Sequence, residues 1–388
     1  MVIKNISTVV AKNLCAKCGI CYSICPAGAI SITGYIDKKP VVNESCNNCG
    51  LCVKACPGLT PIADQDNYNL LGFAKSYFVG YSTDEIIRST SSSGGLITSL
   101  CTSLLNDKKF DGVICTRQHG SDILDNEVIL AKTRHDILSA RGSRYAPAFV
   151  CRGLKDLKLK DGGSYVFVGK PCDIQALTKY QKTIKKYDFL KIALFCAHTP
   201  KMSATKEIID NSGIKFGDIS RLRYRGDGWP GYFTLLSKDN TILYREEYIK
   251  IWSTVLCKSK NRNKRCLLCH DCTGESADLS FGDAWLDKYT GTSPGHSVVI
   301  ARNERAEALL ELATRNGDIH LENVGPETVI ESQKSLLLKK RNRYLCRLAN
   351  QILFEKLPEE TVGFDRSMND VIKIFGLIKQ FALIKFGI

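Results

Sequence analysis

Two runs of cysteines with the same spacing open the sequence, CAKCGICYSICP at residues 15–26 and CNNCGLCVKACP at residues 46–57. Each run reads Cys-x2-Cys-x2-Cys-x3-Cys-Pro. A short loop of this kind presents three sulfurs to three corners of an iron–sulfur cubane, and the proline ends the run. A zinc ribbon needs only four ligands in two Cys-x2-Cys knuckles, and eight cysteines exceed that number. The two runs therefore predict iron–sulfur clusters rather than a zinc site or a disulfide scaffold.

This crossed pattern is typical of bacterial ferredoxins, in which the fourth cysteine of each run binds the other cluster. We therefore assign the ligands of one [4Fe-4S] cluster as Cys15, Cys18, Cys21 and Cys56, and those of the second as Cys46, Cys49, Cys52 and Cys25. Residues 1–62 are expected to form this two-cluster domain, with short strands at 27–32 and 39–42. The chain is expected to carry electrons.

Length and composition limit the number of domains, the location of the protein and its partners. A chain of 388 residues is expected to form two or three domains. Its 18 cysteines lie in metal-type clusters and its start lacks a signal-peptide pattern, so we expect a reducing, cytoplasmic location. The formal charge is +14, and it stays positive after about −2 is added for each of three clusters. A basic chain favours acidic partners, namely an acidic ferredoxin, an anionic cofactor or an anionic membrane surface. Nucleic acid is not an expected partner, because the charges are scattered and no nucleic-acid-binding module is evident.

Beyond a polar linker at 62–71, residues 73–325 are predicted to be an α+β domain with a mixed sheet, since strands alternate with helices. Strands are expected at 73–81, 111–116, 128–132, 165–168, 190–195 and 232–236, and helices at 96–105, 174–180 and 304–316. There is no G-x-G-x-x-G motif or P-loop, so any flavin would bind a fold other than a Rossmann unit.

Residues 326–388 are expected to form a helical C-terminal extension. Within it, residues 370–388 are nearly all apolar, and three lysines spaced six apart leave no clean polar face. We interpret this tail as a buried packing helix, a helix that docks on a partner subunit, or a peripheral membrane anchor.

Three segments are candidates for binding an anion. SSSGG at 91–95 opens a predicted helix, where backbone N–H groups bind a flavin diphosphate or another phosphate, or the serines serve only as caps. RGSRYAP at 141–147 carries two arginines and an aromatic residue. RYRGDGWPGY at 223–232 is a glycine-rich turn that covers a cofactor or simply leads into a strand.

A further group of cysteines follows late in the chain. Cys266, Cys269 and Cys272 have metal-type spacing, and Cys257 lies just upstream. Locally, this group predicts a third [4Fe-4S] cluster, with zinc as the alternative.

Taken together, these segments resemble the coenzyme F-420 hydrogenase/dehydrogenase beta-subunit family with an N-terminal two-cluster ferredoxin domain. The resemblance runs from residue 15 to about residue 302. It rests on the order and spacing of the segments at 92–95, 142–145, 169–172, 195–196, 225–229, 266–269 and 277–283. The resemblance implies a flavin, usually FAD, in the central domain and a [4Fe-4S] cluster beside it.

The family pattern also changes the expected ligands of the third cluster. It implies Cys172, Cys196, Cys266 and Cys269, which we prefer to the local set of Cys257, Cys266, Cys269 and Cys272. One residue departs from the pattern: Lys170 stands where the family often has threonine, and a cation near a flavin phosphate or ring would alter substrate preference.

Ten residues are the resulting site candidates. Those expected to hold the flavin or substrate anions are Ser93, Gly94, Gly95, Ser143, Arg144, Tyr145, Lys170 and Arg225. Asp283 and His198 are candidates for proton transfer, with a structural role as the alternative for each.

The resemblance implies an oxidoreductase that links a small-molecule hydride donor or acceptor, reduced coenzyme F-420, to ferredoxin or another redox subunit. One alternative is a ferredoxin-dependent flavin reductase of another organic substrate, since members of the family act on a chlorophyll intermediate or are associated with polysaccharide synthesis. Another is an electron-wiring subunit without substrate chemistry of its own.

Overall fold

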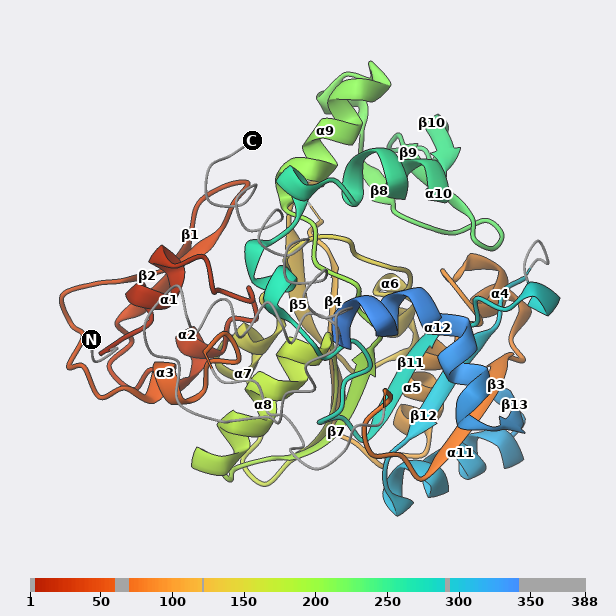
Figure 1. Ribbon diagram of the computed structural model, residues 1–388, viewed down its shortest axis with the longest axis horizontal. Coiled ribbons are helices and arrows are strands. Elements are labelled where there is room, and N and C mark those ends of the chain that lie inside the picture. The colour runs from red at the N-terminus through yellow and green to blue at the C-terminus, as the bar shows by residue number, and fades with distance from the viewer. Residues whose placement is uncertain (1–3, 60–69, 121, 290–293, 342–388) are drawn as a thin grey trace, which may run out of the picture.

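The computed structural model describes residues 4–59, 70–120, 122–289 and 294–341 (Figure 1). The apolar segment at 370–388 and most of the predicted linker lie outside these ranges. Across the described ranges, no helix is both long and apolar enough to cross a lipid bilayer.

The N-terminal module, red in Figure 1, holds both cysteine runs. Its elements are α1 (Ser7–Ala11), α2 (Ile20–Ile24), β1 (Ile30–Thr33), β2 (Lys39–Val42) and α3 (Leu51–Lys54), and the two strands form an antiparallel hairpin. Each ligand loop turns into its helix at a glycine with positive φ, 88° at Gly19 and 74° at Gly50. This conformation costs glycine little and strains any other residue, so the same Cys-Gly step starts both helices.

The body is built on an eight-stranded sheet in the order β13-β3-β12-β11-β7-β6-β4-β5. Four central strands run parallel to one another: β4 (Gly112–Gln118), β6 (Ser164–Gly169), β7 (Asp188–Leu194) and β11 (Leu279–Asp283). The outer strands pair antiparallel and are β3 (Ser76–Ser82), β5 (Asn126–Ala131), β12 (Ser297–Ala301) and β13 (Ile319–Val324). Because both faces are covered, the central strands are apolar on both sides.

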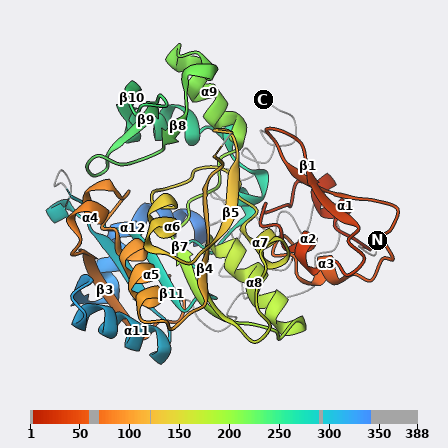
Figure 2. The same ribbon diagram turned by 180° about the vertical axis from the view of Figure 1, so that it is seen from behind.

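Helices cover the two faces of this sheet (Figures 1 and 2). On one face, α5 (Leu96–Asn106) and α11 (Glu304–Arg315) share an apolar core with the strands. On the other, α7 (Gly153–Asp156) packs against β5, α8 (Pro171–Thr183) packs against β6 and β7, and α12 (Pro326–Arg341) packs against β12. The short helices α4 (Glu85–Thr90) and α6 (Arg134–Ser139) complete this layer structure.

A smaller sheet forms a separate lobe, at the top of Figure 1. Its strands β8 (Arg221–Arg223), β9 (Tyr232–Leu236) and β10 (Ile242–Glu247) are antiparallel. They pack with α9 (Met202–Ser212), α10 (Tyr248–Ile251) and the π-helical turn η3 (Trp252–Leu256) around a core of their own. This lobe brings Arg225, Tyr248 and Trp252 over the ends of the central strands.

The ferredoxin module shares a hydrophobic core with the body. Ile20 and Ile24 of α2 belong to one buried cluster with Val150, Leu154 and Leu177. The backbone also crosses the junction, since Phe149 N–H donates to Lys17 O at 3.2 Å and Cys151 N–H donates to Cys18 O at 2.8 Å. The module therefore packs as part of the folded body rather than as a separate domain on a linker.

The mixed α/β architecture with an N-terminal ferredoxin-like module is confirmed. Predicted strands at 39–42 and 232–236 coincide with β2 and β9, and the predicted helix at 174–180 is the middle of a longer α8. One local expectation is wrong: the cap of α5 is Gly95 in the left-handed conformation, and no serine hydroxyl caps it. The domain limits stay a prediction, although α12, which opens the predicted extension, packs on the body.

Candidate functional site

A cavity of about 610 Å³ lies where the parallel strands end. Lys170 follows β6, Cys196 follows β7, and Asp283 ends β11, and all three line the cavity. Ligand sites of open α/β sheets lie at the carboxyl ends of parallel strands, because loops there converge from several strands. Every candidate for holding the flavin or substrate lines this cavity except Gly94.

The serine–glycine segment before α5 forms one wall. Ser92 Oγ accepts from Ser143 N–H at 2.9 Å, which ties this segment to the 141–147 loop, and Ser93 Oγ donates to His296 O at 2.7 Å. Gly94 lies behind the wall, because a Cβ there would stand 2.7 Å from Gly80 O. Gly94 N–H donates to Ser297 Oγ at 3.0 Å. Gly94 therefore allows the segment to pack closely, while its neighbours face the cavity.

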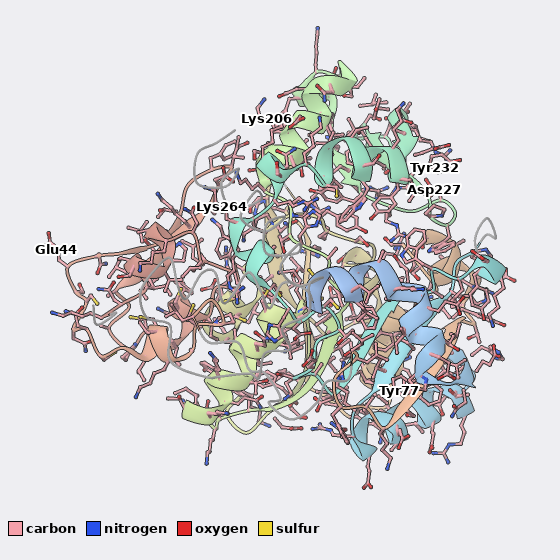
Figure 3. All side chains as sticks on the ribbon, viewed as in Figure 1. Glu44, Tyr77, Lys206, Asp227, Tyr232 and Lys264 are labelled. Atoms are coloured by element: carbon pink, nitrogen blue, oxygen red, sulfur yellow. The ribbon has the colours of Figure 1, made fainter. Side chains whose placement is uncertain are left out.

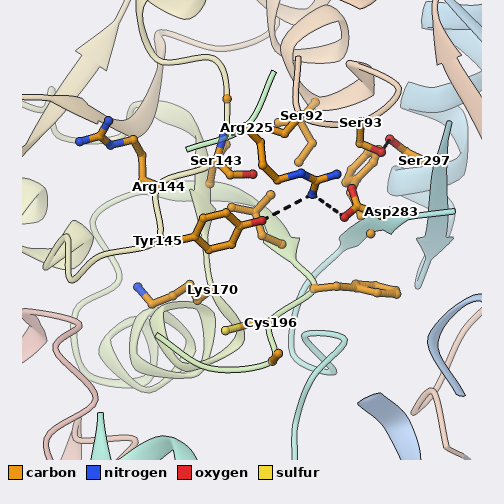
Figure 4. Close-up of a pocket in the computed structure, with 18 of the residues that line it drawn as sticks. Ser92, Ser93, Ser143, Arg144, Tyr145, Lys170, Cys196, Arg225, Asp283 and Ser297 are labelled. Atoms are coloured by element: carbon orange, nitrogen blue, oxygen red, sulfur yellow. Dashed lines mark hydrogen bonds and ion pairs between the residues drawn. The ribbon is translucent and has the colours of Figure 1, made fainter. Parts of the chain in front are cut away.

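Arg225 is the central cation of the cavity (Figure 4). Its Nη1 donates to Asp283 Oδ2 at 2.7 Å and to Tyr145 Oη at 3.4 Å, and its guanidinium lies 4.5 Å from the ring centroid of Tyr248. Burial lowers the pKa of Arg225, but Asp283, Tyr145 and Tyr248 together more than offset this, so the pKa is raised overall. Its Nη2 is buried and has no hydrogen-bond partner among the described residues. An unmet N–H group of a buried cation is a ready donor to an anionic ligand.

Arg144 also lines the cavity, but its guanidinium points away from Arg225 (Figure 4). Its Nε donates to Asn126 Oδ1 at 2.9 Å, and its guanidinium lies 5.2 Å from the Tyr224 ring centroid. Its Nη2 is buried and has no partner among the described residues. Burial lowers the pKa of Arg144. Arg225 is therefore the arginine whose head group lies in the middle of the lining residues.

Lys170 lies at the floor of the cavity near Cys196 (Figure 4). Its Nζ is 2.7 Å from Asp173 Oδ2, and the Asp173 side chain is only 1% exposed. Burial lowers the pKa of Lys170, but the charges of Asp173 and Cys172 raise it further, so the lysine stays a cation. This residue is thus committed to an internal ion pair at the base of α8.

The two candidates for proton transfer are both held in place. His198 Nε2 lies 2.9 Å from Leu256 O, and its ring stacks against Trp252 at 4.9 Å between centroids. Asp283 carries the ion pair with Arg225 described above. Both side chains line the cavity. Proton transfer by either of them stays a prediction.

A second, smaller cavity adjoins the first. Its lining includes all four cysteines that the family pattern implies, Cys172, Cys196, Cys266 and Cys269. Of the two alternatives, Cys257 Sγ accepts from Arg262 Nη2 at 2.9 Å, and Cys272 is buried in the core beneath α12. Neither is among the described residues that line this small cavity. The four-cysteine set fits a cluster at this position.

Backbone N–H groups point at several of the proposed ligand sulfurs. Thr199 N–H donates to Cys266 Sγ at 3.3 Å, Lys17 N–H to Cys15 Sγ at 3.4 Å and Gly58 N–H to Cys56 Sγ at 3.3 Å. Such bonds stabilise a thiolate over a thiol and tune the cluster that it binds. Within the described ranges, no three His, Cys, Asp or Glu side chains converge as ligands of a single metal ion do.

Comparison with known families agrees with this arrangement. Residues 77–155 and 162–327 match the N-terminal and C-terminal parts of the coenzyme F420 hydrogenase/dehydrogenase beta subunit. The chain belongs to this family. Residues 7–57 match a 4Fe-4S dicluster domain, which confirms the iron–sulfur character of the N-terminal module.

Several known proteins are similar to the chain. An uncharacterized protein of Methanocaldococcus jannaschii is 29% identical over 64% of this chain and 66% of its own length. The coenzyme F420-dependent sulfite reductase of the same organism is 23% identical over 87% of this chain, which spans only 51% of that protein. The coenzyme F420 hydrogenase subunit beta of Methanococcus voltae is 25% identical over 70% of this chain and 93% of that subunit.

One solved structure has the same fold. It is a chain of the F420-reducing [NiFe] hydrogenase complex from Methanosarcina barkeri, with a TM-score of 0.57 and 21% sequence identity. The match covers 74% of this chain and 94% of that one.

Some residues that line the larger cavity were not among the candidates selected from the sequence. Tyr248 and Trp252 lie four residues apart on one helical surface, a spacing that could have suggested a shared face. Trp285 closely follows Asp283 and could have been included with it. Gln333 of α12 had no such signal, and its Nε2 donates to Asp283 O at 2.6 Å. Helix α12 thus contributes to the cavity from far along the chain.

Proposed function

We propose that the chain is an iron–sulfur flavoprotein oxidoreductase. It would pass electrons between a two-electron partner, the reduced deazaflavin coenzyme F-420, and one-electron carriers. FAD would occupy the larger cavity, a third [4Fe-4S] cluster the smaller one, and the two N-terminal clusters would lead to ferredoxin or a partner subunit.

The observation that carries this proposal is that the two cavities share a wall. Cys196, His198 and Thr199 line both of them. They follow β7 directly, so one strand end fixes the position of both sites. A cofactor in the larger cavity would therefore lie beside a cluster bound through Cys196, which is the arrangement that electron exchange requires.

The residues of the larger cavity suit an anionic, aromatic ligand. Arg225 offers a buried N–H group that has no partner among the described residues, and Gly95 leaves the start of α5 open to phosphate. Tyr145, Tyr248 and Trp285 provide apolar surface around Arg225. A bound flavin would supply the interconversion of hydride and single-electron chemistry, and the protein's part is to bind it and orient it.

The ion pair between Arg225 and Asp283 would orient the ligand. Asp283 accepts from Nη1 and Pro230 O accepts from Nε, so Nη2 is the group that remains, among the described residues, for a carboxylate or phosphate. We expect Arg225→Lys to lose the two-sided geometry and to weaken flavin or deazaflavin binding, because an ammonium is a point donor.

The experiment begins with anaerobic analysis of iron, sulfide and flavin, followed by mixing the oxidised protein with reduced deazaflavin. About twelve irons and one flavin per chain, with rapid bleaching of the flavin, would support the proposal. The same cofactors without bleaching, but with reduction by ferredoxin, would instead support a ferredoxin-dependent reductase of another substrate. Absence of flavin from the purified protein would contradict both enzyme functions and leave an electron-wiring subunit.

A further inference from the structure

Arg265 is a buried arginine between two of the proposed cluster sites. It lies in the 3-10 turn η5 (Lys264–Leu268), directly before Cys266, and is 7% exposed. The turn begins at Asn263, whose Oδ1 accepts from Arg265 N–H at 3.3 Å. A long side chain on such a short turn can usually extend into solvent. The burial of this guanidinium therefore needs a reason beyond the packing of the turn.

One edge of the guanidinium contacts the ferredoxin module. Arg265 Nη2 donates to Pro57 O at 3.0 Å, and Pro57 follows Cys56, a proposed ligand of the inner cluster. Nearby, Asn263 Nδ2 donates to Cys15 O at 3.1 Å and Lys179 Nζ to Cys56 O at 3.1 Å. Three side chains of the body thus hold the backbone of the ligand loops of the inner cluster.

Two further nitrogens of this guanidinium have no acceptor among the described residues. Arg265 Nε and Nη1 are buried and make no hydrogen bond within the described residues. Arg265 also lines the small cavity that Cys172, Cys196, Cys266 and Cys269 share. Leaving two N–H groups of a buried cation without an acceptor is costly, so these groups are suited to an acceptor that fills the cavity. A cluster with thiolate and sulfide sulfurs and a net negative charge is such an acceptor.

We propose that Arg265 bridges the third cluster and the inner N-terminal cluster and raises the reduction potential of the third. One of its unmet N–H groups, on Nε or Nη1, would donate to a sulfur of the cluster at Cys172, Cys196, Cys266 and Cys269, while Nη2 stays on Pro57 O. The inference rests on the third cluster of the proposed function. Hydrogen bonds to sulfur and local positive charge both favour the reduced, more negative cluster.

Other charged groups near the cavity do not replace this role. Asp271 is fully buried and accepts from Gln175 Nε2 at 3.1 Å and from the 273–275 backbone. Lys170 is paired with Asp173 on the side of the larger cavity. Arg265, by contrast, both donates to the ligand loop of the inner cluster at Pro57 O and lines the small cavity.

The test compares two single substitutions in the full chain, purified anaerobically with its clusters. Arg265→Gln removes the buried charge and keeps one donor, and Lys264→Gln removes the same charge from an exposed neighbour, labelled in Figure 3. Redox titrations followed by electron paramagnetic resonance give the midpoint of each cluster. Loss of one signal in Cys269→Ala identifies the third cluster.

We expect R265Q to raise the oxidised-to-reduced ratio of the third cluster about tenfold at a fixed potential. For a one-electron couple, this corresponds to a midpoint potential about 59 mV lower. K264Q should leave every midpoint unchanged. If R265Q fails to hold its clusters, Arg265→Lys decides the matter, because it keeps the charge without the planar fork and should give a smaller shift in the same direction.

Two results would overturn the inference, and the iron content tells them apart. About twelve irons in the unmodified protein, with the midpoint of the third cluster unmoved in both R265Q and R265K, would contradict the role of Arg265 alone. About eight irons would remove the third cluster, and with it both this inference and that part of the proposed function.

Discussion

The two cysteine runs have one sequence pattern and two different surroundings. In both, a glycine with positive φ precedes a short helix that carries the third cysteine. Ile20, after the first glycine, is 1% exposed and belongs to the core shared with the body, whereas Leu51, its counterpart in the second run, is only partly buried. Cys18 is buried, and its counterpart Cys49 is exposed.

The difference shows that the end of the module with the first run faces the body. The body holds the first run through backbone bonds to Lys17 and Cys18 and through Asn263. The start of the second run, with Cys46 and Cys49, faces outward, whereas Lys179 and Arg265 hold its end at Cys56 and Pro57. Since solvent exposure is among the factors that set a cluster's potential, the two proposed clusters should differ in potential despite their identical ligand spacing. In the proposed function, the inner cluster would exchange electrons with the body and the outer cluster with a docking carrier.

Removal of one cluster at a time should have the largest effect and tests whether the two runs differ in their coupling to the body. We expect Cys18→Ala to lose the inner cluster and to destabilise the junction with the body, because cluster binding contributes to folding and Cys18 lies in the shared core. Cys49→Ala should lose the outer cluster but leave the body folded. Iron content and anaerobic thermal unfolding measure both effects. An equal fall in melting temperature for the two variants would contradict the distinction.

A smaller change tests the shared core directly. Ile20→Ala should lower the free energy of unfolding by about 2–5 kcal/mol, because it opens a cavity at a fully buried site. Leu51→Ala should cost clearly less, since part of that side chain already contacts water. Denaturant unfolding of the two variants under anaerobic conditions gives the difference. A larger loss for Leu51→Ala would show that the second run, not the first, is anchored.

Local spacing explains how much of the molecule could be predicted. The cysteine runs, the strands at 39–42 and 232–236 and the helix opening at Leu96 depend on nearby residues, so the sequence was sufficient to predict them. The continuous apolar run along β6 likewise indicated a buried strand without distant information. The ligand assignments remain predictions, although the four cysteines implied by the family do line one cavity.

What could not be predicted depends on contacts between distant segments. Gln333 reaches Asp283 from 50 residues away, and Arg265 reaches Pro57 across 208 residues. Nothing in the pattern around Gly19 distinguishes it from Gly50, and only the packing of Phe149 against the first run does so. The cap of α5 was mispredicted for a related reason, since the serines before it bond to the 141–147 loop and to the start of β12 instead.

The two glycines provide a matched pair that sharpens the comparison. Both have positive φ, so Gly19→Ala and Gly50→Ala share a backbone cost of about 1–2 kcal/mol. A Cβ at Gly19 would also stand 2.8 Å from Phe149 O, whereas one at Gly50 meets no atom within 4 Å. Gly19→Ala should therefore cost about 1–3 kcal/mol more in unfolding free energy. Equal costs in denaturant unfolding would mean that the body does not press on the first run.

The smallest expected effect concerns a single hydrogen bond across the junction. Lys179→Met keeps most of the side-chain stem but removes the Nζ that donates to Cys56 O, and should lower the unfolding free energy by about 1 kcal/mol. Lys182→Met is the control, because Lys182 is exposed on the same helix. Since Cys56 is a proposed ligand of the inner cluster, K179M should also release iron from that cluster faster than K182M when a chelator is added. Equal rates of iron release would show that the clamp on the first cluster depends on Asn263 and Arg265 without Lys179, because those two side chains hold the neighbouring carbonyls of Cys15 and Pro57.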